Sequence, residues 1–368
     1  MLAPIETPLV IAIHGIFALL SARDDNRSPG LLDLRLAAVV KARQGDGNGR
    51  PEPVCEEIPM TFSRLLAASA ALMVMACGPA LAGDKPKFQV SITVDDLTVH
   101  GALPPGTTRQ QVGDNFLNAF KVHGVKEAWG FINGKSLIED PSTETVLASW
   151  RAAGHPLGNH GFTHMSASQN TVAAFKGDIE GNEPILKSYM GDADWHWLRF
   201  PFLNAGSDAG HGEIMQFVKD TGYRIADVTI TFNDWAYTDA YARCAARGDT
   251  AAVASLREKY MSDVVASVKR ARGLSQKIYG RDIPHVLLIH VGAFTGEMLP
   301  EVLTAFDAEG AEYVTLEQAQ SDPAYDFTGP KAAQGTMLER VAQEKGIKID
   351  DGSIASLNDV GPIMGMCQ

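Results

Sequence analysis

The chain has 368 residues, of which 45% are hydrophobic and 21% charged, and this composition is that of an ordinary globular protein with enough apolar material for a core. Its formal net charge of −12 argues against nucleic-acid binding, because proteins that follow a phosphate backbone depend on clustered Lys and Arg. A neutral or cationic small molecule or a glycan is the expected partner.

Residues 1–59 include the linker-like stretch QGDGNGRPEP. Because the next segment resembles a signal peptide, which belongs at a true N-terminus, we interpret residues 1–59 as a non-native upstream extension or a disordered segment. Translation would then begin at Met60. The alternative is a genuine extension in which residues 8–20 form an apolar segment of their own, and N-terminal sequencing of the exported protein would distinguish the two.

Residues 60–82 have the pattern of a secretory signal peptide. Arg64 supplies the positive charge, residues 65–76 supply the apolar region, and the A-L-A sequence at 80–82 is the cleavage site. The alternative, a buried core helix, would not usually end in G-P-A-L-A. The apolar run is shorter than the roughly 20 residues of a membrane span, so we expect an exported, periplasmic or secreted protein without a stable span. A lipoprotein anchored at Cys77 is a second alternative.

From residue 83 to 330, short apolar runs alternate with amphipathic stretches. The apolar runs predict seven strands: Phe88–Val94, Ala128–Ile132, His155–Asn159, Leu198–Phe200, Ile225–Ile230, Val286–Val291 and Tyr313–Leu316. Apolar residues near a 3.6-residue period predict helices over Thr171–Tyr189 and Ala251–Ala271. This alternation predicts a parallel α/β fold, and about seven strands suggest a barrel, whose chemistry lies at the C-terminal ends of its strands.

Residues 331–368 are predicted to be a C-terminal appendage. Thr336–Lys345 has a helical pattern, and the Gly-rich residues 350–368 are expected to be loosely ordered. Cys244 and Cys367 are the two cysteines downstream of the signal. They could pair in an oxidising compartment, and the sequence leaves the paired and unpaired states equally open.

Ionisable side chains follow several of the predicted strands. Each has an ordinary structural explanation, because paired Asp residues cap turns, histidines four apart are common in cores, and an Arg before Pro often binds carbonyls. The ordered combination is what indicates a site. Its members are Asp95, Asp96, His160, His164, Arg199, Asp234 and His290.

This ordered set resembles the polysaccharide deacetylase (NodB-like) family, also called carbohydrate esterase family four. The resemblance covers residues 89–320 and implies a distorted (β/α)7 barrel. T-V-D-D-L at 93–97 is similar to the T-F-D-D-G motif of the family, H-G-F-T-H at 160–164 to H-[ST]-x-x-H, and R-F-P-F at 199–202 to R-x-P-[YF]. F-N-D-W at 232–235 is similar to the end of D-x-x-D-W, and L-L-I-H at 287–290 to L-x-x-H.

The resemblance implies a metal-dependent deacetylase that acts on an acetylated carbohydrate. Asp96, His160 and His164 would bind a divalent metal, with Zn²⁺ expected first and Co²⁺ or Mn²⁺ as alternatives. Asp95 would be the base and Arg199 would orient it.

On the leaving-group side, the resemblance implies His290 as the acid. Asp234 is interpreted as the residue that orients His290. Phe202 and Trp235 are expected either to bind substrate, by lining an acetyl pocket or stacking on a sugar, or simply to pack in the core.

Three positions depart from the family motifs: Leu97 replaces Gly, Gly161 replaces Ser or Thr, and Thr231 replaces Asp. None of these changes removes an implied ligand, the base or the acid, so the enzyme interpretation stands and the substrate becomes less defined. The alternatives are a hydrolase of a small non-sugar amide on the same fold and a catalytically decayed glycan-binding protein. Metal bound without turnover would favour the second.

Overall fold

The computed structural model describes residues 88–327, 334–349, 357 and 359–368, and all of them lie in one compact unit, Ala82–Gln368. The predicted extension, the signal peptide and Cys77 lie outside the described residues. Among the helices of the described part, none is both long and apolar enough to cross a bilayer.

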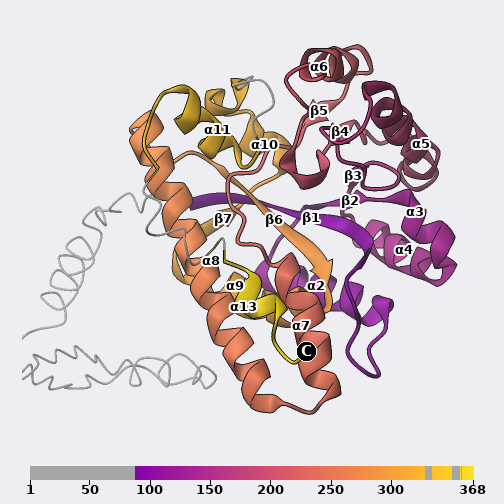
Figure 1. Cartoon of the computed structure of the whole chain (residues 1–368), viewed down its shortest axis with the longest axis vertical. Coiled ribbons are helices and arrows are strands. Elements are labelled where there is room, and N and C mark those ends of the chain that lie inside the picture. Colours follow the sequence, from indigo (N-terminus) through magenta and orange to yellow (C-terminus); the bar gives the residue numbers. More distant parts are fainter. Residues whose placement is uncertain (1–87, 328–333, 350–356, 358) are drawn as a thin grey trace, which may run out of the picture. The chain divides into compact units, whose positions relative to one another are not determined.

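Seven parallel strands form one curled sheet (Figure 1). The order is β5-β4-β3-β2-β1-β6, and β7 also pairs with β1. Past β5, the chain returns to the other edge of the sheet and forms a bridge between Ile230 and Leu287 of β6. The fold is therefore the distorted (β/α) barrel that the sequence predicted. The strands are β1 (Phe88–His100), β2 (Ala128–Ile132), β3 (Leu157–Asn159), β4 (Trp197–Leu198), β5 (Arg224–Ile225), β6 (His285–Gly292) and β7 (Ala311–Tyr313).

Helices connect the strands and cover the sheet. They are α2 (Arg109–His123), α3 (Gly134–Glu139), α4 (Glu144–Ala152), α5 (Val172–Met190), α6 (His211–Asp220), α7 (Trp235–Ala246), α8 (Thr250–Tyr279), α9 (Ala293–Ala308), α10 (Leu316–Gln320), α11 (Met337–Glu344) and α13 (Gly361–Met364). Short 3₁₀ turns are η2 (Pro141–Thr143), η3 (Pro201–Leu203) and η4 (Pro323–Asp326). The predicted helix at 171–189 is confirmed as α5, which Thr171 caps by accepting the N–H of Ala174. The predicted helix at 251–271 continues to Tyr279 and stops at Gly280, a left-handed residue.

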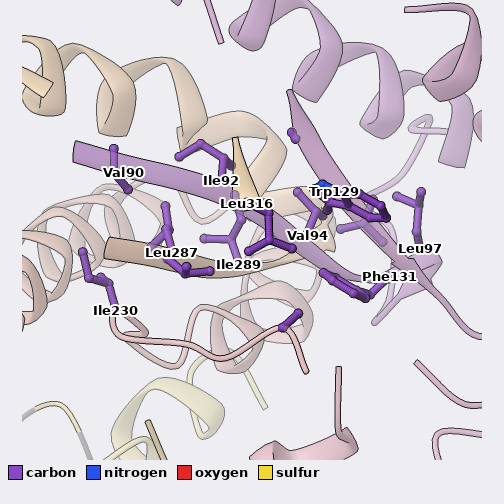
Figure 2. Packing of buried hydrophobic residues seen from close by; sticks show 14 of the residues in the cluster. Val90, Ile92, Val94, Leu97, Trp129, Phe131, Ile230, Leu287, Ile289 and Leu316 are labelled. Atoms are coloured by element: carbon purple, nitrogen blue, oxygen red, sulfur yellow. The ribbon is translucent and has the colours of Figure 1, made fainter. Parts of the chain in front are cut away.

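The core lies against two neighbouring strands, β1 and β6. Side chains of Val90, Ile92 and Val94 from β1 pack in one cluster with Leu287 and Ile289 from β6 (Figure 2). All five are at most 1% exposed. Burying each of them contributes about 1.5–3 kcal/mol, which explains why these apolar runs could be recognised as strands.

The C-terminal region is not a loose appendage where it is described. Met337 and Leu338 of α11 are completely buried, and the N–H of Met337 donates to the carbonyl of Val228. Helix α11 packs against α8. Thr336 caps α11, so the helical prediction for residues 336–345 is confirmed.

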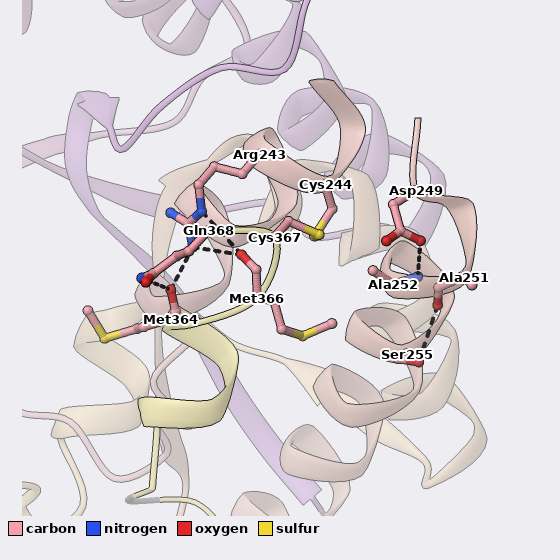
Figure 3. Close-up of a disulfide and its surroundings, with 10 residues drawn as sticks. All are labelled: Arg243, Cys244, Asp249, Ala251, Ala252, Ser255, Met364, Met366, Cys367 and Gln368. Atoms are coloured by element: carbon pink, nitrogen blue, oxygen red, sulfur yellow. Dashed lines mark hydrogen bonds between the residues drawn. A yellow bond between two sulfur atoms is a disulfide. The ribbon is translucent and has the colours of Figure 1, made fainter. Parts of the chain in front are cut away.

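A disulfide fixes the end of the chain to α7 (Figure 3). Cys244 and Cys367 are bonded, with their Cα atoms 5.2 Å apart. The guanidinium of Arg243 donates to the carbonyls of Met364 and Met366 at 2.6 and 3.1 Å. The expectation of a loosely ordered end is therefore wrong for residues 359–368, because a covalent bond and these hydrogen bonds supply the order that the Gly-rich sequence does not suggest.

Candidate active site

The ionisable residues singled out in the sequence meet at the C-terminal ends of the strands. Asp95 in β1 pairs in register with His290 in β6. On the other side of β1, the N–H of Arg199 after β4 donates to the carbonyl of Asn159 at the end of β3, next to His160. Parallel strands bring their carboxyl ends to one edge, so residues far apart in the chain become neighbours.

Asp95 is held by a buried arginine. Nη1 of Arg199 lies 2.8 and 3.0 Å from the two carboxylate oxygens. Arg199 also donates through Nη2 to Thr93 at 3.0 Å and through Nε to the carbonyl of Ala226 at 2.7 Å. Its guanidinium lies over the ring of Phe131. Both charges are at most 2% exposed, so each depends on the other for compensation and the carboxylate has a fixed orientation.

Asp96, His160 and His164 form a cluster that fits a metal ion. Each offers a ligand atom, and these atoms lie within 4.8 Å of one another. Nε2 of His160 and of His164 lie 3.6 and 3.7 Å from Oδ1 of Asp96. Nδ1 of His160 donates to the carbonyl of Arg199 at 2.8 Å, which leaves the lone pair on Nε2, toward the cluster. One carboxylate and two imidazoles suit zinc and similar divalent metals.

The protonation states of the cluster also suit a cation. Burial, with the neighbouring His160, lowers the pKa of His164 to about 4, so this ring is neutral near pH 7. Burial alone would raise the pKa of Asp96, but a hydrogen bond from His100 and the positive fields of His290 and His160 lower it below its usual range. A metal therefore meets a carboxylate and a free imidazole without displacing protons from them.

His290 is bound to a buried aspartate. Its Nδ1 donates to Oδ1 of Asp234 at 2.8 Å, and its backbone N–H donates to Oδ2 at 2.7 Å. Thr295 donates to the same Oδ2 at 2.8 Å, and Asp234 is fully buried. Burial alone would lower the pKa of His290, but Asp234, with Asp96 and Asp95, raises it to about 9. Near neutral pH this imidazole carries a proton that it can donate.

One histidine of the site was missed in the sequence. Nδ1 of His100 lies 2.8 Å from Oδ2 of Asp96, and its ring centroid is 5.0 Å from that of His290. Residues four apart in a regular strand are about 13 Å apart. His100 reaches Asp96 because the β1–β6 register shifts between Asp95 and His100, and no residue pattern in the sequence predicts that irregularity.

The two aromatic candidates are not in the core. Phe202 is 54% exposed and its ring centroid lies 4.5 Å from that of His164. Trp235 is 38% exposed, directly after Asp234, and donates from Nε1 to Oδ1 of Asn233. The alternative of plain core packing is excluded, and both rings are available to a ligand at the edge of the site.

The departure at Gly161 has a steric explanation. Its φ is +76°, and a Cβ there would lie 2.6 Å from Oδ2 of Asp178. Asp178 instead accepts hydrogen bonds from the N–H and the hydroxyl of Thr163. The loop that carries the two histidines is thus anchored by a carboxylate in a space that a side chain at 161 would occupy. The other departure near the metal cluster, Leu97, is fully buried in the core.

Residues 82–226 match the model of the family described as polysaccharide deacetylase. Over these residues the chain is similar to that family. The matched part includes Asp95, Asp96, His160, His164 and Arg199, whereas Asp234 and His290 lie beyond it. A comparison with curated proteins finds no match.

Solved structures of similar proteins include deacetylases and a protein described as a pseudoenzyme. A chitin deacetylase from Colletotrichum lindemuthianum is 21% identical, with a TM-score of 0.45 over 64% of this chain and 88% of that one. A family 4 carbohydrate esterase from Streptomyces lividans, in complex with acetate, is 17% identical, with a TM-score of 0.40 over 63% and 95%. A carbohydrate esterase family 4 pseudoenzyme from Bacillus anthracis is 15% identical, with a TM-score of 0.43 over 63% and 65%, so this chain spans less than two thirds of it.

Proposed function

We propose that the protein is a metal-dependent hydrolase that removes N- or O-linked acetyl groups from a carbohydrate or polysaccharide. One observation carries the proposal. The cluster of Asp96, His160 and His164 adjoins a buried carboxylate, Asp95, whose Oδ2 lies 3.6 Å from Nε2 of His160, and the strand partner of Asp95 is His290, which is protonated near neutral pH. Metal-assisted acyl transfer to water uses these three features together: a cation site, a proton acceptor and a proton donor.

The residues of the chain then have distinct tasks. Zn²⁺, or alternatively Co²⁺ or Mn²⁺, held by Asp96, His160 and His164 would polarise the acetyl carbonyl and lower the pKa of water towards ~7. Asp95, fixed by Arg199, accepts a proton from the water that attacks the acetyl carbon. The products are acetate and a free amino or hydroxyl group.

His290 serves the leaving group. When the bond between the acetyl carbon and the leaving atom breaks, the amine or alcohol needs a proton. Nδ1 of His290 is engaged by Asp234, so Nε2 is the atom that donates. Phe202 and Trp235 contact the sugar at the edge of the site, where their exposed faces can stack on a pyranose ring.

Acetate release from a panel of N- and O-acetylated sugars tests the proposal. Purified residues 83–368 are assayed with added Zn²⁺ or Co²⁺, with a chelator, and as the Asp95→Asn and His290→Asn variants. We expect release that requires metal and is lost in both variants. The second variant is needed because Asp95→Asn leaves the buried Arg199 without its counter-charge, whereas His290→Asn leaves that pair intact.

Other outcomes separate the alternatives. Stoichiometric metal without acetate release from any sugar would contradict the deacetylase, and a parallel panel of small amides would then distinguish an amide hydrolase from a glycan-binding protein. Neither metal nor release would contradict the metal-dependent mechanism altogether.

We also propose that the protein is exported to the periplasm or the medium. The signal pattern at residues 60–82 supports this, and so does the Cys244–Cys367 disulfide, since such bonds persist in oxidising compartments. Fractionation of cells that express the full chain should recover a form that begins near residue 83 outside the cytoplasm. An uncleaved cytoplasmic protein would contradict export.

A further inference from the structure

The geometry points to His100 as a positioning residue for the cation site: it fixes the carboxylate of Asp96 so that one oxygen faces His160 and His164. This inference rests on the proposed metal-dependent function. It concerns a residue outside the motifs on which the family resemblance was built.

The two oxygens of Asp96 have different surroundings. Oδ1 lies 3.6 and 3.7 Å from Nε2 of His160 and His164. Oδ2 lies 2.8 Å from Nδ1 of His100, and because a carboxylate only accepts, Nδ1 carries the proton and donates it. Among the residues that the structure describes, His100 is the one hydrogen-bond donor to Asp96. Its loss would leave the carboxylate free to rotate away from the two histidines.

His100 is itself held in place. Its carbonyl accepts a hydrogen bond from Nη1 of Arg109 at 3.1 Å, and the other Nη of Arg109 donates to the carbonyl of Gly101. Beyond Gly101, the N–H of Ala102 donates to Oδ1 of Asp239 at 2.7 Å. The ring is 17% exposed, so it lies within the site rather than in solvent. These bonds hold the backbone of residues 100–102, from which the imidazole of His100 reaches Asp96.

Loss of a hydrogen-bond partner of a metal ligand commonly weakens metal binding by about 10- to 100-fold. We expect this loss for Zn²⁺ in His100→Ala. Two further variants separate the donor from the bulk of the ring. In His100→Asn, the amide nitrogen takes the place of Nδ1 and retains the hydrogen bond to Asp96. In His100→Gln, the amide nitrogen takes the place of Nε2, and that hydrogen bond is lost.

Zn²⁺ affinity is measured by competition with a chromophoric chelator, and the visible spectrum of the Co²⁺-loaded protein reports ligand geometry. His100→Ala and His100→Gln should bind about 10- to 100-fold more weakly and change the Co²⁺ spectrum, whereas His100→Asn should remain close to wild type. The matched control is His123→Ala, which breaks a similar pair, Nδ1 to Oδ2 of Asp307 at 2.6 Å, and should change neither measurement.

If all four variants bound Zn²⁺ as tightly as wild type and gave its Co²⁺ spectrum, the positioning role would be overturned. The role would also be overturned if His100→Asn bound Zn²⁺ as weakly as His100→Ala while its melting temperature equalled that of wild type. Both readouts are obtained without substrate, so they are independent of the deacetylase proposal. A wild-type protein that binds metal and releases no acetate contradicts the proposed function alone, and a wild-type protein without metal affinity overturns both.

Discussion

His290 and Asp234 show how one buried neighbour sets the chemistry of a residue. A histidine in a dry environment would ordinarily be neutral, and the three hydrogen bonds that Asp234 accepts keep its negative charge next to the imidazole. The pKa of His290 is raised to about 9 as a result. A group that must donate a proton works below its pKa, so kcat/KM should fall as the pH rises through that alkaline value.

Asp234→Asn removes this charge and retains the shape of the side chain. The pKa of His290 should fall, so the alkaline limb of the kcat/KM profile should move to lower pH, with a loss of roughly 10²–10⁴-fold where the imidazole has become neutral. A pH profile of acetate release measures both changes. Asp307→Asn, which removes an exposed carboxylate, is the control. An alkaline limb that does not move would contradict the role of Asp234.

Gly161→Ser restores the family residue and should destabilise the fold. The backbone there has a φ of +76°, and the new Cβ would collide with Asp178 at 2.6 Å. We expect a loss of about 1–3 kcal/mol in the free energy of unfolding, measured by chemical denaturation. Gly177→Ala in α5 is the matched control, because its Cβ meets nothing within 4 Å; it should be neutral or stabilising by up to about 1 kcal/mol. Equal stability of Gly161→Ser and wild type would show that the loop readily adapts.

At the scale of elements, the strands with the most buried residues were predicted most accurately from the sequence. The bounds of β2 were predicted as they are observed, and the centres of β1 and β6 were found because these strands are buried on both faces and rich in apolar residues. The strand predicted at 313–316 is wrong at its end, because Thr315 begins a capping box and starts α10. Asp96, His160 and His164, which come from different motifs, lie close together, and their role as ligands stays a prediction. His100 was not predictable, since a register shift and not a sequence pattern brings it to Asp96.

Two short elements, η3 and the start of α7, carry exposed aromatic rings to the edge of the site. If these rings bind sugar, Phe202→Ala and Trp235→Ala should each raise KM for an acetylated oligosaccharide by about tenfold, equivalent to ~1.4 kcal/mol, with little change in kcat. Val265→Ala is the control, since Val265 is an apolar side chain that is 58% exposed on α8 and belongs to neither of these elements. Steady-state kinetics on oligomers of increasing length checks this. Unchanged KM values would exclude a substrate contact for either ring.

At the scale of the whole molecule, the end of the chain is fixed to the helix that begins beside the site. Nδ2 of Asn233 donates to the carbonyl of Leu357, Arg243 binds the carbonyls of the last residues, and Cys244 is bonded to Cys367. Figure 1 shows the C-terminus beside α7. The C-terminal region thus completes the unit by packing on α7, whose first turn follows Asp234.

The disulfide should therefore contribute to stability more than to chemistry. It closes a segment with a sequence separation of 123 residues, and the entropy that this removes from the unfolded chain is worth about 5 kcal/mol at most. Cys244 lies nine residues along α7 from Trp235, or about 14 Å, so the hydrogen bonds between Asp234 and His290 do not depend on it.

Reduction, or Cys367→Ser, should lower the guanidinium midpoint of unfolding markedly and leave acetate release unchanged well below the melting temperature. A reductant-treated Cys367→Ser variant is the control, because it should show no further decrease. Loss of activity with an unchanged midpoint would instead mean that the bond acts on the site through α7.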